Sequence, residues 1–287
     1  MLDSPTLPPP NAAAIDREFK YSQSDFRAIA AVLREEAGIS LPDGKAPLVY
    51  ARLVKRLRTL NLTNFADYVA LLRTVDAVDE RRFMLTALTT NVTRFFREPH
   101  HFEHLRAHIM QPLAQSKRSE RFRLWSAACS TGQEPYSIAA VVADAIPNAA
   151  QRGIKILATD IDPAVVEQAE RGMYESIDGV PPDMRRWFER DGNGWSVDPL
   201  LTSLITFKCM NLNARWPVNG PFDVIFCRNV AIYFDQDVQA RLWSSFAGVM
   251  PAGATFYIGH SERVSGPAAA LYENVGITTY RRRSAGA

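Results

Sequence analysis

The stretch Leu124–Ser137, LWSAACSTGQEPYS, is the part of the sequence that most clearly provides for a bound ligand. An apolar lead-in runs into five small residues and a Thr-Gly pair, and an apolar Ile-Ala-Ala-Val-Val segment then begins. This pattern predicts a buried strand that turns sharply into a helix. Small side chains at Ser126, Ala128 and Ser130, with Gly132 at the turn, would let the backbone approach a ligand closely.

Two motifs that this stretch lacks narrow the class of ligand. The G-x-G-x-x-G pattern of dinucleotide sites is absent, and no G-K-[ST] sequence follows, as it would in a phosphate-binding loop. The stretch therefore predicts a nucleoside-like ligand that has no pyrophosphate to bind.

Asp160, in the segment ILATDID, is the next candidate. It follows Gly132 by about 28 residues, close to the position at which nucleotide-binding α/β folds place an acid on the ribose. A carboxylate can accept hydrogen bonds from both ribose hydroxyls. Aspartates at strand ends are also common helix N-caps, and for Asp160 alone this alternative is equally good. Together with the small-residue turn, the ribose interpretation is favoured.

The segment CRNVAIYF supplies two more polar candidates. At the end of a third strand, Asn229 would lie beside an adenine or methionine group of the ligand, and Tyr233 would follow one helical turn later. We expect the neighbouring Ile232 and Phe234 to belong to the hydrophobic core.

The elements that must position these residues begin at about Arg121. Strand-like runs there alternate with helical runs of 10 to 15 residues, which predicts a parallel sheet with right-handed crossovers. Ligands of such sheets bind at the carboxyl ends of the strands. Residues 177–210 interrupt the alternation with a short helix (PDMRRWFER), a turn at residues 191–194 and two strand-like runs, which predicts a small antiparallel insert.

The preceding part of the chain has an all-helical pattern. It predicts helices over residues 25–37, 47–60, 64–73 and 78–89, the first with Ser24 as its N-cap and Gly38 at its end. We therefore expect a helical domain over residues 21–90, a linker over 91–101 and an α/β domain over 102–287. The Pro- and Ala-rich residues 1–20 are expected to be a disordered tail.

The composition is that of an ordinary globular protein, with 47% hydrophobic and 22% charged residues. A formal charge of +2 is too small to indicate nucleic-acid binding. Three widely spaced cysteines indicate reduced thiols in a cytoplasmic protein. The N-terminal residues are not typical of a signal peptide, and no apolar run is long enough to span a membrane.

Five segments occur in the order and at the spacing of a known family. They are LTTNVTRFFREPHHF, LWSAACSTGQEPYSIA, ILATDID, FDVIFCRNVAIYF and IGHSE. Over residues 24 to 280 the chain resembles the chemotaxis receptor methyltransferases, the CheR family, which methylate glutamates of bacterial chemoreceptors with S-adenosylmethionine. The resemblance implies a class I (Rossmann-like) S-adenosylmethionine-dependent methyltransferase domain with a small β-subdomain insert, preceded by an all-α domain.

The resemblance also implies a role for individual residues. Glu134 would hold the amino group of the cofactor's methionine, and Asp160 its ribose. Arg97 and Tyr233 would orient the substrate glutamate, with Arg97 also close to the charged end of the cofactor. The other residues implied to contact the cofactor are Asn91, Thr93, Asn211, Leu212, Asn229 and Val230.

The chemistry that the resemblance implies needs few side chains. A glutamate carboxylate is ionised at neutral pH, so no general base is needed, and the sulfonium cofactor supplies the activated methyl group. His101, His104 and His108 have a spacing that could hold a metal ion, but no HExxH-type signature accompanies them and the chemistry needs no metal. We expect no metal, with these histidines on a helix surface and in local hydrogen bonds.

The helix predicted over residues 47–60 carries a basic face made of Arg52, Lys55, Arg56 and Arg58. Such a face can simply be solvated. The resemblance favours docking onto an acidic receptor helix bundle instead, and no interleaved aromatic residues support nucleic-acid binding. The hairpin DGNGWSVDPLLTS is shorter than in family members that grip a receptor C-terminal peptide, so we expect a monomer that acts without that tether.

Two other functions stay open at this point. One is an S-adenosylmethionine-dependent methyltransferase that acts on nitrogen, although CRNVAIYF lacks the Pro-Pro pair of amino methyltransferases. The other is a cofactor-binding adaptor without turnover, which the absence of Arg97 or Tyr233 would favour. Both residues are present.

Overall fold

The computed structural model describes residues 18–89, 91–116 and 121–284. The chain divides into two compact units, one formed by residues up to Val32 together with Pro42–Leu88, the other by Leu33–Leu41 together with Thr89 onward. Most of the predicted tail lies outside the described residues. Residues 18–20 do not fit that prediction, because Phe19 is buried and Lys20 forms a β-bridge with Asn64.

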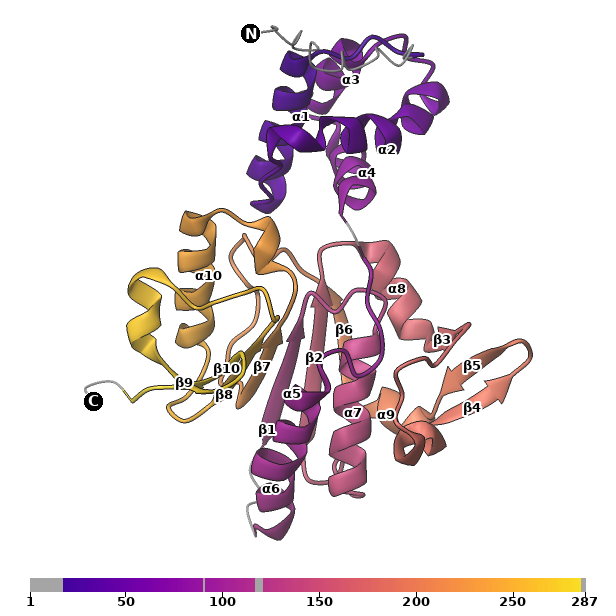
Figure 1. Cartoon of the computed structure of the whole chain (residues 1–287). Helices are drawn as coiled ribbons and strands as arrows, with labels where there is room; N and C mark the ends of the chain where they lie inside the picture. The colour runs from indigo at the N-terminus through magenta and orange to yellow at the C-terminus, as the bar shows by residue number, and fades with distance from the viewer. Residues whose placement is uncertain (1–17, 90, 117–120, 285–287) are drawn as a thin grey trace, which may run out of the picture. The chain divides into compact units, whose positions relative to one another are not determined.

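The first unit is all-helical, as predicted, and is drawn in indigo and violet in Figure 1. Side chains from each of its α-helices are buried in its core, among them Phe26, Leu53, Tyr68 and Met84. Its elements are most of α1 (Gln23–Ala37), a short 3-10 helix (Asp43–Lys45), α2 (Ala46–Thr59), α3 (Phe65–Leu72) and α4 (Val78–Leu88).

The start of α1 differs from the prediction. Ser22, not Ser24, caps the helix: its Oγ accepts a hydrogen bond from the Asp25 backbone N–H at 3.2 Å, and the Asp25 carboxylate accepts one from the Ser22 N–H at 2.8 Å. This reciprocal pair satisfies two N–H groups that a helix start would leave unpaired. The helix therefore begins at Gln23, two residues earlier than expected.

The second unit is built on a seven-stranded sheet of order β6-β2-β1-β7-β8-β10-β9. The first five strands in this order are parallel, and β10 runs antiparallel to both β8 and β9 (Figure 1). The chain order reverses beside β1, which makes this the switch point of the sheet. The strands are β1 (Phe122–Ala127), β2 (Ile154–Asp160), β6 (Ile205–Cys209), β7 (Val224–Cys227), β8 (Thr255–Ile258), β9 (Tyr272–Gly276) and β10 (Thr279–Arg282).

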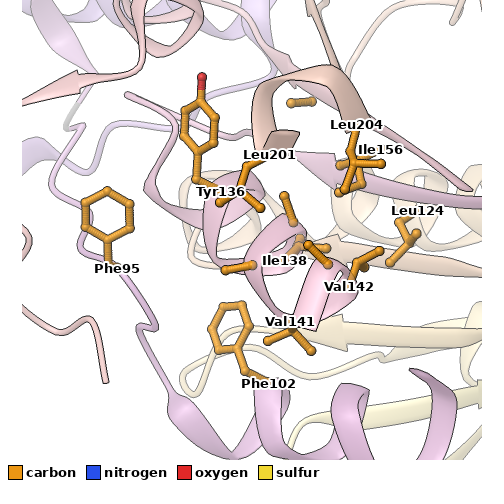
Figure 2. Close-up of a cluster of buried hydrophobic side chains, with 14 of the residues drawn as sticks. Phe95, Phe102, Leu124, Tyr136, Ile138, Val141, Val142, Ile156, Leu201 and Leu204 are labelled. Atoms are coloured by element: carbon orange, nitrogen blue, oxygen red, sulfur yellow. The ribbon is translucent and has the colours of Figure 1, made fainter. Parts of the chain in front are cut away.

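Helices pack on both faces of this sheet. On one face, Leu124 of β1 lies in a buried cluster with Tyr136, Ile138 and Val142 of α7 (Figure 2). On the other face, Trp125 makes an edge-to-face contact with Phe246 of α10, with 5.3 Å between the ring centroids. Besides the end of α1 and the helices of the insert, the helical elements of this unit are α5 (Pro99–His104), a π-helix (Leu105–Met110), α6 (Gln111–Gln115), α7 (Gln133–Ala145), α8 (Pro163–Arg171), α10 (Gln236–Gly248) and two 3-10 helices (Ala231–Tyr233, Gly266–Leu271).

The predicted antiparallel insert exists but has different bounds. Its sheet, of order β3-β5-β4, already begins at β3 (Met173–Tyr174) and continues with β4 (Phe188–Asp191) and β5 (Gly194–Val197). The segment 205–209, assigned to the insert from the sequence, is instead edge strand β6 of the main sheet, paired with β2. The predicted helix PDMRRWFER is helical only over its first six residues, because its 3-10 turn (Pro182–Trp187) gives way to β4. A short helix, α9 (Pro199–Leu204), links β5 to β6.

None of the described helices combines the length and the apolar character that a membrane span requires.

Candidate active site

A pocket opens at the carboxyl ends of β1, β2 and β7, entirely within the second unit. Its empty volume, open solvent included, is about 980 Å³. All ten cofactor-site and catalytic residues singled out from the sequence line it: Asn91, Thr93, Arg97, Glu134, Asp160, Asn211, Leu212, Asn229, Val230 and Tyr233. The fold thus brings together residues spread over more than 140 positions of the chain.

The turn between β1 and α7 is tight at several successive residues. Ala128 and Ser130 both have positive φ angles, 67° and 49°, which non-glycine residues rarely adopt. Gly132 has a φ of 96°, and a Cβ there would lie 2.7 Å from the Tyr174 hydroxyl. Strained backbone of this kind clusters at ligand sites, because the surrounding structure has to hold it in place.

Asp160 lies at the end of β2 and is buried. Its carboxylate accepts hydrogen bonds from the Ser130 N–H at 2.8 Å and the Asp162 N–H at 3.1 Å. The N-cap of α8 is Asp162, which accepts from the Ala164 N–H at 2.9 Å, so Asp160 is not the cap. A carboxylate oxygen can accept more than one hydrogen bond, so Asp160 keeps acceptor capacity for a ligand. Burial raises its pKa above the usual range.

Glu134 lies in the first turn of α7, where a helix N-terminus favours negative charge. One carboxylate oxygen accepts a hydrogen bond from the Ser126 hydroxyl at 2.7 Å, and the other from Arg228 Nη1 at 3.2 Å. Burial raises the pKa of this carboxyl, while the positive charge of Arg228 works against that rise.

Arg228 is a functional residue that sequence reasoning missed. Its side chain is 1% exposed and lies between two carboxylates, those of Glu134 and Glu98, with 3.4 Å from Nη2 to the nearer Glu98 oxygen. The same Nη2 donates to the Arg97 carbonyl. The sequence did carry a signal for Arg228, because a charged residue directly follows the apolar run FDVIFC. An arginine next to a buried strand is expected to be paired with an acidic residue.

Glu98 connects this network to the end of β7. It has a φ of 60°, and its Oε1 lies 3.4 Å from Asn229 Nδ2 and 3.1 Å from His260 Nδ1. Burial disfavours the charged form of Glu98. Nevertheless, the charge of Arg228 and the hydrogen bonds from His260 lower its pKa to about 2. Glu98 is therefore a fixed anion beside the pocket at neutral pH.

The segment that contains Asn91, Thr93 and Arg97 belongs to the second unit. The Ser130 hydroxyl donates to the Asn91 carbonyl at 3.0 Å, and Arg97 Nη1 donates to the Val92 carbonyl at 3.2 Å. Buried Phe95 and Phe96 anchor the segment in the core. These contacts explain how the predicted linker supplies one wall of the pocket.

Asn211 has a structural task as well as a place in the pocket. Its Nδ2 donates to the Glu36 carbonyl at 2.6 Å, and its Oδ1 accepts from the Asn213 N–H at 2.8 Å. These two bonds hold the Asn211 side chain in place at the edge of the pocket. The neighbouring Leu212 supplies an apolar wall, together with Met210.

Tyr233 lies at the end of the 3-10 helix that follows β7, and its carbonyl accepts from the Ser40 N–H at 2.8 Å. The two neighbours that we assigned to the core behave differently from each other. Phe234 is buried, as predicted, but Ile232 is 48% exposed, so its assignment to the core is wrong. A single 3-10 turn points successive side chains in different directions, which explains the difference.

The histidines do not share one environment. His101, expected on a helix surface, is fully buried; its Nε2 lies 2.8 Å from the Thr278 hydroxyl, and burial lowers its pKa to about 3. His104 Nδ1 lies 2.8 Å from the Tyr257 hydroxyl.

Among the described residues, one group could hold a metal ion: Glu98, His100 and His101. Arg228 already places a positive charge on that glutamate, and the expectation of no metal stays a prediction.

The predicted docking face of α2 is largely committed to internal contacts of the first unit. Arg56 pairs with the buried Glu80, and Arg58 pairs with Glu18. Arg52 donates to the Ala87 carbonyl at 3.1 Å. Lys55 is exposed, and its role in docking stays a prediction along with that of the three arginines.

Comparison with family models and curated proteins gives a consistent result. Residues 24–89 match the all-alpha domain of CheR methyltransferases, and residues 91–281 match their S-adenosylmethionine-binding domain. A probable chemotaxis protein methyltransferase of Rhizobium etli is 51% identical over 263 residues, which cover 89% of this chain and 98% of that protein. The chemotaxis protein methyltransferase of Escherichia coli is 42% identical and covers 85% of this chain and 86% of its own length. Chemotaxis protein methyltransferase 2 of Pseudomonas aeruginosa is 39% identical, with coverages of 92% and 95%.

Proposed function

The chain belongs to the CheR family of chemotaxis methyltransferases, and we propose that it transfers the methyl group of S-adenosylmethionine to glutamate carboxylates on the cytoplasmic domain of bacterial chemoreceptors. The products would be glutamyl methyl esters and S-adenosylhomocysteine. Such esters neutralise receptor charge reversibly, which is the chemistry that chemotactic adaptation requires.

S-adenosylmethionine is the cofactor of this family, and the side chains of the pocket fit its parts. Glu134 offers a carboxylate for the ammonium group, and Asp160 keeps acceptor capacity for the ribose hydroxyls. Leu212 and Met210 supply apolar surface for the adenine. Asn91, Thr93, Asn229 and Val230 complete the wall around the methionine part.

The choice of a carboxylate as methyl acceptor rests on the lining of the pocket, whose two carboxylates, Glu134 and Asp160, are assigned to the cofactor. Among the described residues that line the pocket there are three arginines and a tyrosine but no histidine or lysine. The bound cofactor supplies an activated methyl group, and an ionised carboxylate attacks it without losing a proton. The protein has to align the carboxylate with the methyl group and exclude water, and we assign Arg97 and Tyr233 to that alignment.

Receptor recognition is assigned to the helical first unit. The exposed Lys55 offers positive charge to an acidic helical bundle, and such complementarity sets association rate and register. The small sheet supports action without a receptor peptide tether, because β4 and β5 have four residues each and are joined by a tight turn at Gly192. We propose a monomer that works in the cytoplasm.

The test is transfer of labelled methyl from S-adenosylmethionine to purified chemoreceptor cytoplasmic fragments, followed by mild alkali. Label released as methanol supports the proposal, because esters hydrolyse under these conditions. Incorporated label that resists alkali contradicts it and favours methylation of nitrogen. Tight cofactor binding without incorporation into any chemoreceptor fragment contradicts the receptor assignment and favours a non-catalytic adaptor.

A further inference from the structure

A second buried carboxylate, that of Glu262, binds the backbone of the loop that follows β7. It accepts hydrogen bonds from the N–H groups of Asn229 at 3.0 Å, Val230 at 2.9 Å and Ala231 at 2.7 Å, and a longer one from Ile232 at 3.3 Å. Glu262 is only 9% exposed and is not among the residues that line the pocket. Its carboxylate thus acts on the protein's own backbone.

These four N–H groups are ones that the local structure leaves unpaired. Val230, Ala231 and Ile232 lie at the start of the 3-10 helix Ala231–Tyr233. The first N–H groups of a helix have no hydrogen-bond partner within that helix. Asn229 has a φ of 59°, in the left-handed region. One carboxylate therefore satisfies four successive donors and stabilises a strained conformation.

Gly259, at the end of β8, completes the arrangement. Its N–H donates to the Glu262 carboxylate at 2.5 Å. A Cβ at this position would lie 2.7 Å from the Asn229 backbone nitrogen and 2.8 Å from a Glu262 oxygen. Only glycine lets β8 approach the loop closely enough for the carboxylate to reach all five N–H groups.

The loop held in this way carries much of the pocket. Asn229, Val230 and Tyr233 all line it, and the adjacent Arg228 bridges Glu134 and Glu98. A shift of the loop by about 1 Å would move both the wall around the methyl donor and the tyrosine assigned to the substrate. Glu262 does not line the pocket, so we expect any effect on catalysis to pass through the loop.

We propose that Glu262 is a positioning residue of this methyltransferase, which fixes the Asn229–Ile232 backbone so that Asn229, Val230 and Tyr233 face the cofactor and the methyl acceptor. The cofactor part of this proposal is independent of which protein is methylated. The part on turnover rests on the proposed chemoreceptor substrate.

The first variant is E262Q, which keeps the shape of the side chain but replaces one acceptor oxygen with an NH₂ donor. That group would face the N–H groups it can no longer bind. We expect the dissociation constant for S-adenosylmethionine, measured by calorimetry, to rise about 10-fold to 100-fold. With chemoreceptor fragments as acceptor, kcat should also fall about 10-fold at saturating cofactor.

G259A perturbs the same loop from the other side and should produce the same pair of changes. Because both substitutions act through one loop, the double variant should lose less than the sum of the two single losses, expressed as free energies. E273Q is the matched control: Glu273 is exposed on β9, and its change should leave both constants within about 2-fold.

The proposal is tested by comparing the effect of E262Q on thermal stability with its effect on cofactor affinity and kcat. A folded E262Q enzyme with lower thermal stability but unaltered cofactor affinity and kcat would overturn the proposal, since the carboxylate would then be purely structural. If wild type binds cofactor and methylates no receptor fragment, the substrate proposal fails while the calorimetric test of Glu262 still stands. If E262Q does not fold, the test becomes hydrogen exchange of the backbone amides of residues 229–232 in the wild-type protein. Bound cofactor should slow that exchange, and exchange rates that cofactor leaves unchanged would overturn the proposal.

Discussion

Asp160 and Glu262 are two buried carboxylates near the carboxyl edge of one sheet, and they differ in how much hydrogen-bond acceptor capacity remains for a ligand. Asp160 binds two backbone N–H groups and keeps acceptor capacity that faces the pocket. Glu262 binds five and lies outside the pocket lining. We propose that the number of hydrogen bonds already made within the protein separates a carboxylate that binds the ligand from one that positions the backbone. The same distinction applies to the arginines: Arg228 is enclosed by carboxylates, whereas Arg97 makes one backbone bond from its guanidinium.

The largest effect that tests this distinction should come from Arg97. Replacement by alanine removes a cation that is free to meet the substrate carboxylate, so we expect methyl transfer to fall about 100-fold to 1,000-fold at saturating cofactor. Cofactor affinity, measured by calorimetry, should change by less than about 10-fold. Equal losses in binding and turnover would instead assign Arg97 to the cofactor alone.

Asp160 provides the next largest effect. D160N removes the charge and one acceptor from the proposed ribose contact, and we expect the dissociation constant for S-adenosylmethionine to rise about 10-fold to 100-fold. D198A is its control, because Asp198 caps α9 and does not line the pocket, so its loss costs about 1 kcal/mol of stability away from the ligand. If D198A weakens cofactor binding as much as D160N does, the effect of D160N is one of stability and not of a ribose contact.

The pH dependence of cofactor binding tests the two raised carboxyl pKa values. Burial raises the pKa of both Glu134 and Asp160, so protons return to these groups at a higher pH than to exposed carboxyls. The ammonium and ribose contacts require the ionised forms. Affinity should therefore fall as the pH is lowered from about 7 to about 5, with proton release on binding at the lower end. Calorimetry in two buffers of different ionisation enthalpy measures that release, and E134Q should reduce it.

How much of this site the sequence could predict depended on where the partners of each residue lie. Asp160 and Gly132 belong to consecutive strand–helix units, so spacing along the chain was enough to relate them. The partners of Arg228 lie 94 and 131 residues away, and those of Glu262 up to 33 residues away on another strand end. Periodicity carries no information on such contacts. The same reason explains why segment 205–209 was assigned to the insert, since only its pairing with β2 shows that it is part of the main sheet.

Two smaller errors, on the N-cap of α1 and on the burial of Ile232, depended on details of local structure. Ser22 and Ser24 are both suitable N-caps, and the choice of Ser22 depends on the reciprocal bond with Asp25. Ile232 follows an apolar strand but lies in a 3-10 turn, which exposes it. In both cases the residue type was informative and its exact surroundings were decisive.

The smallest effect on methyl transfer is expected from the basic face of α2. This face also allows a charge that stabilises the domain, Arg56, to be compared with one proposed to dock receptors, Lys55. Arg56 shares the buried Glu80 with the Tyr68 hydroxyl, so R56A leaves a buried carboxylate short of a partner and should cost about 1–3 kcal/mol of unfolding free energy. Lys55 is exposed, and K55A should leave that free energy within about 0.5 kcal/mol. If this face docks receptors, K55A should lower kcat/KM for receptor fragments about 2-fold to 5-fold at low salt and less at high salt, because screening weakens the attraction. Urea unfolding and methyl-transfer assays at two ionic strengths measure both quantities. A salt-independent effect of K55A, or none at all, would mean that the basic face of α2 serves the stability of its own domain.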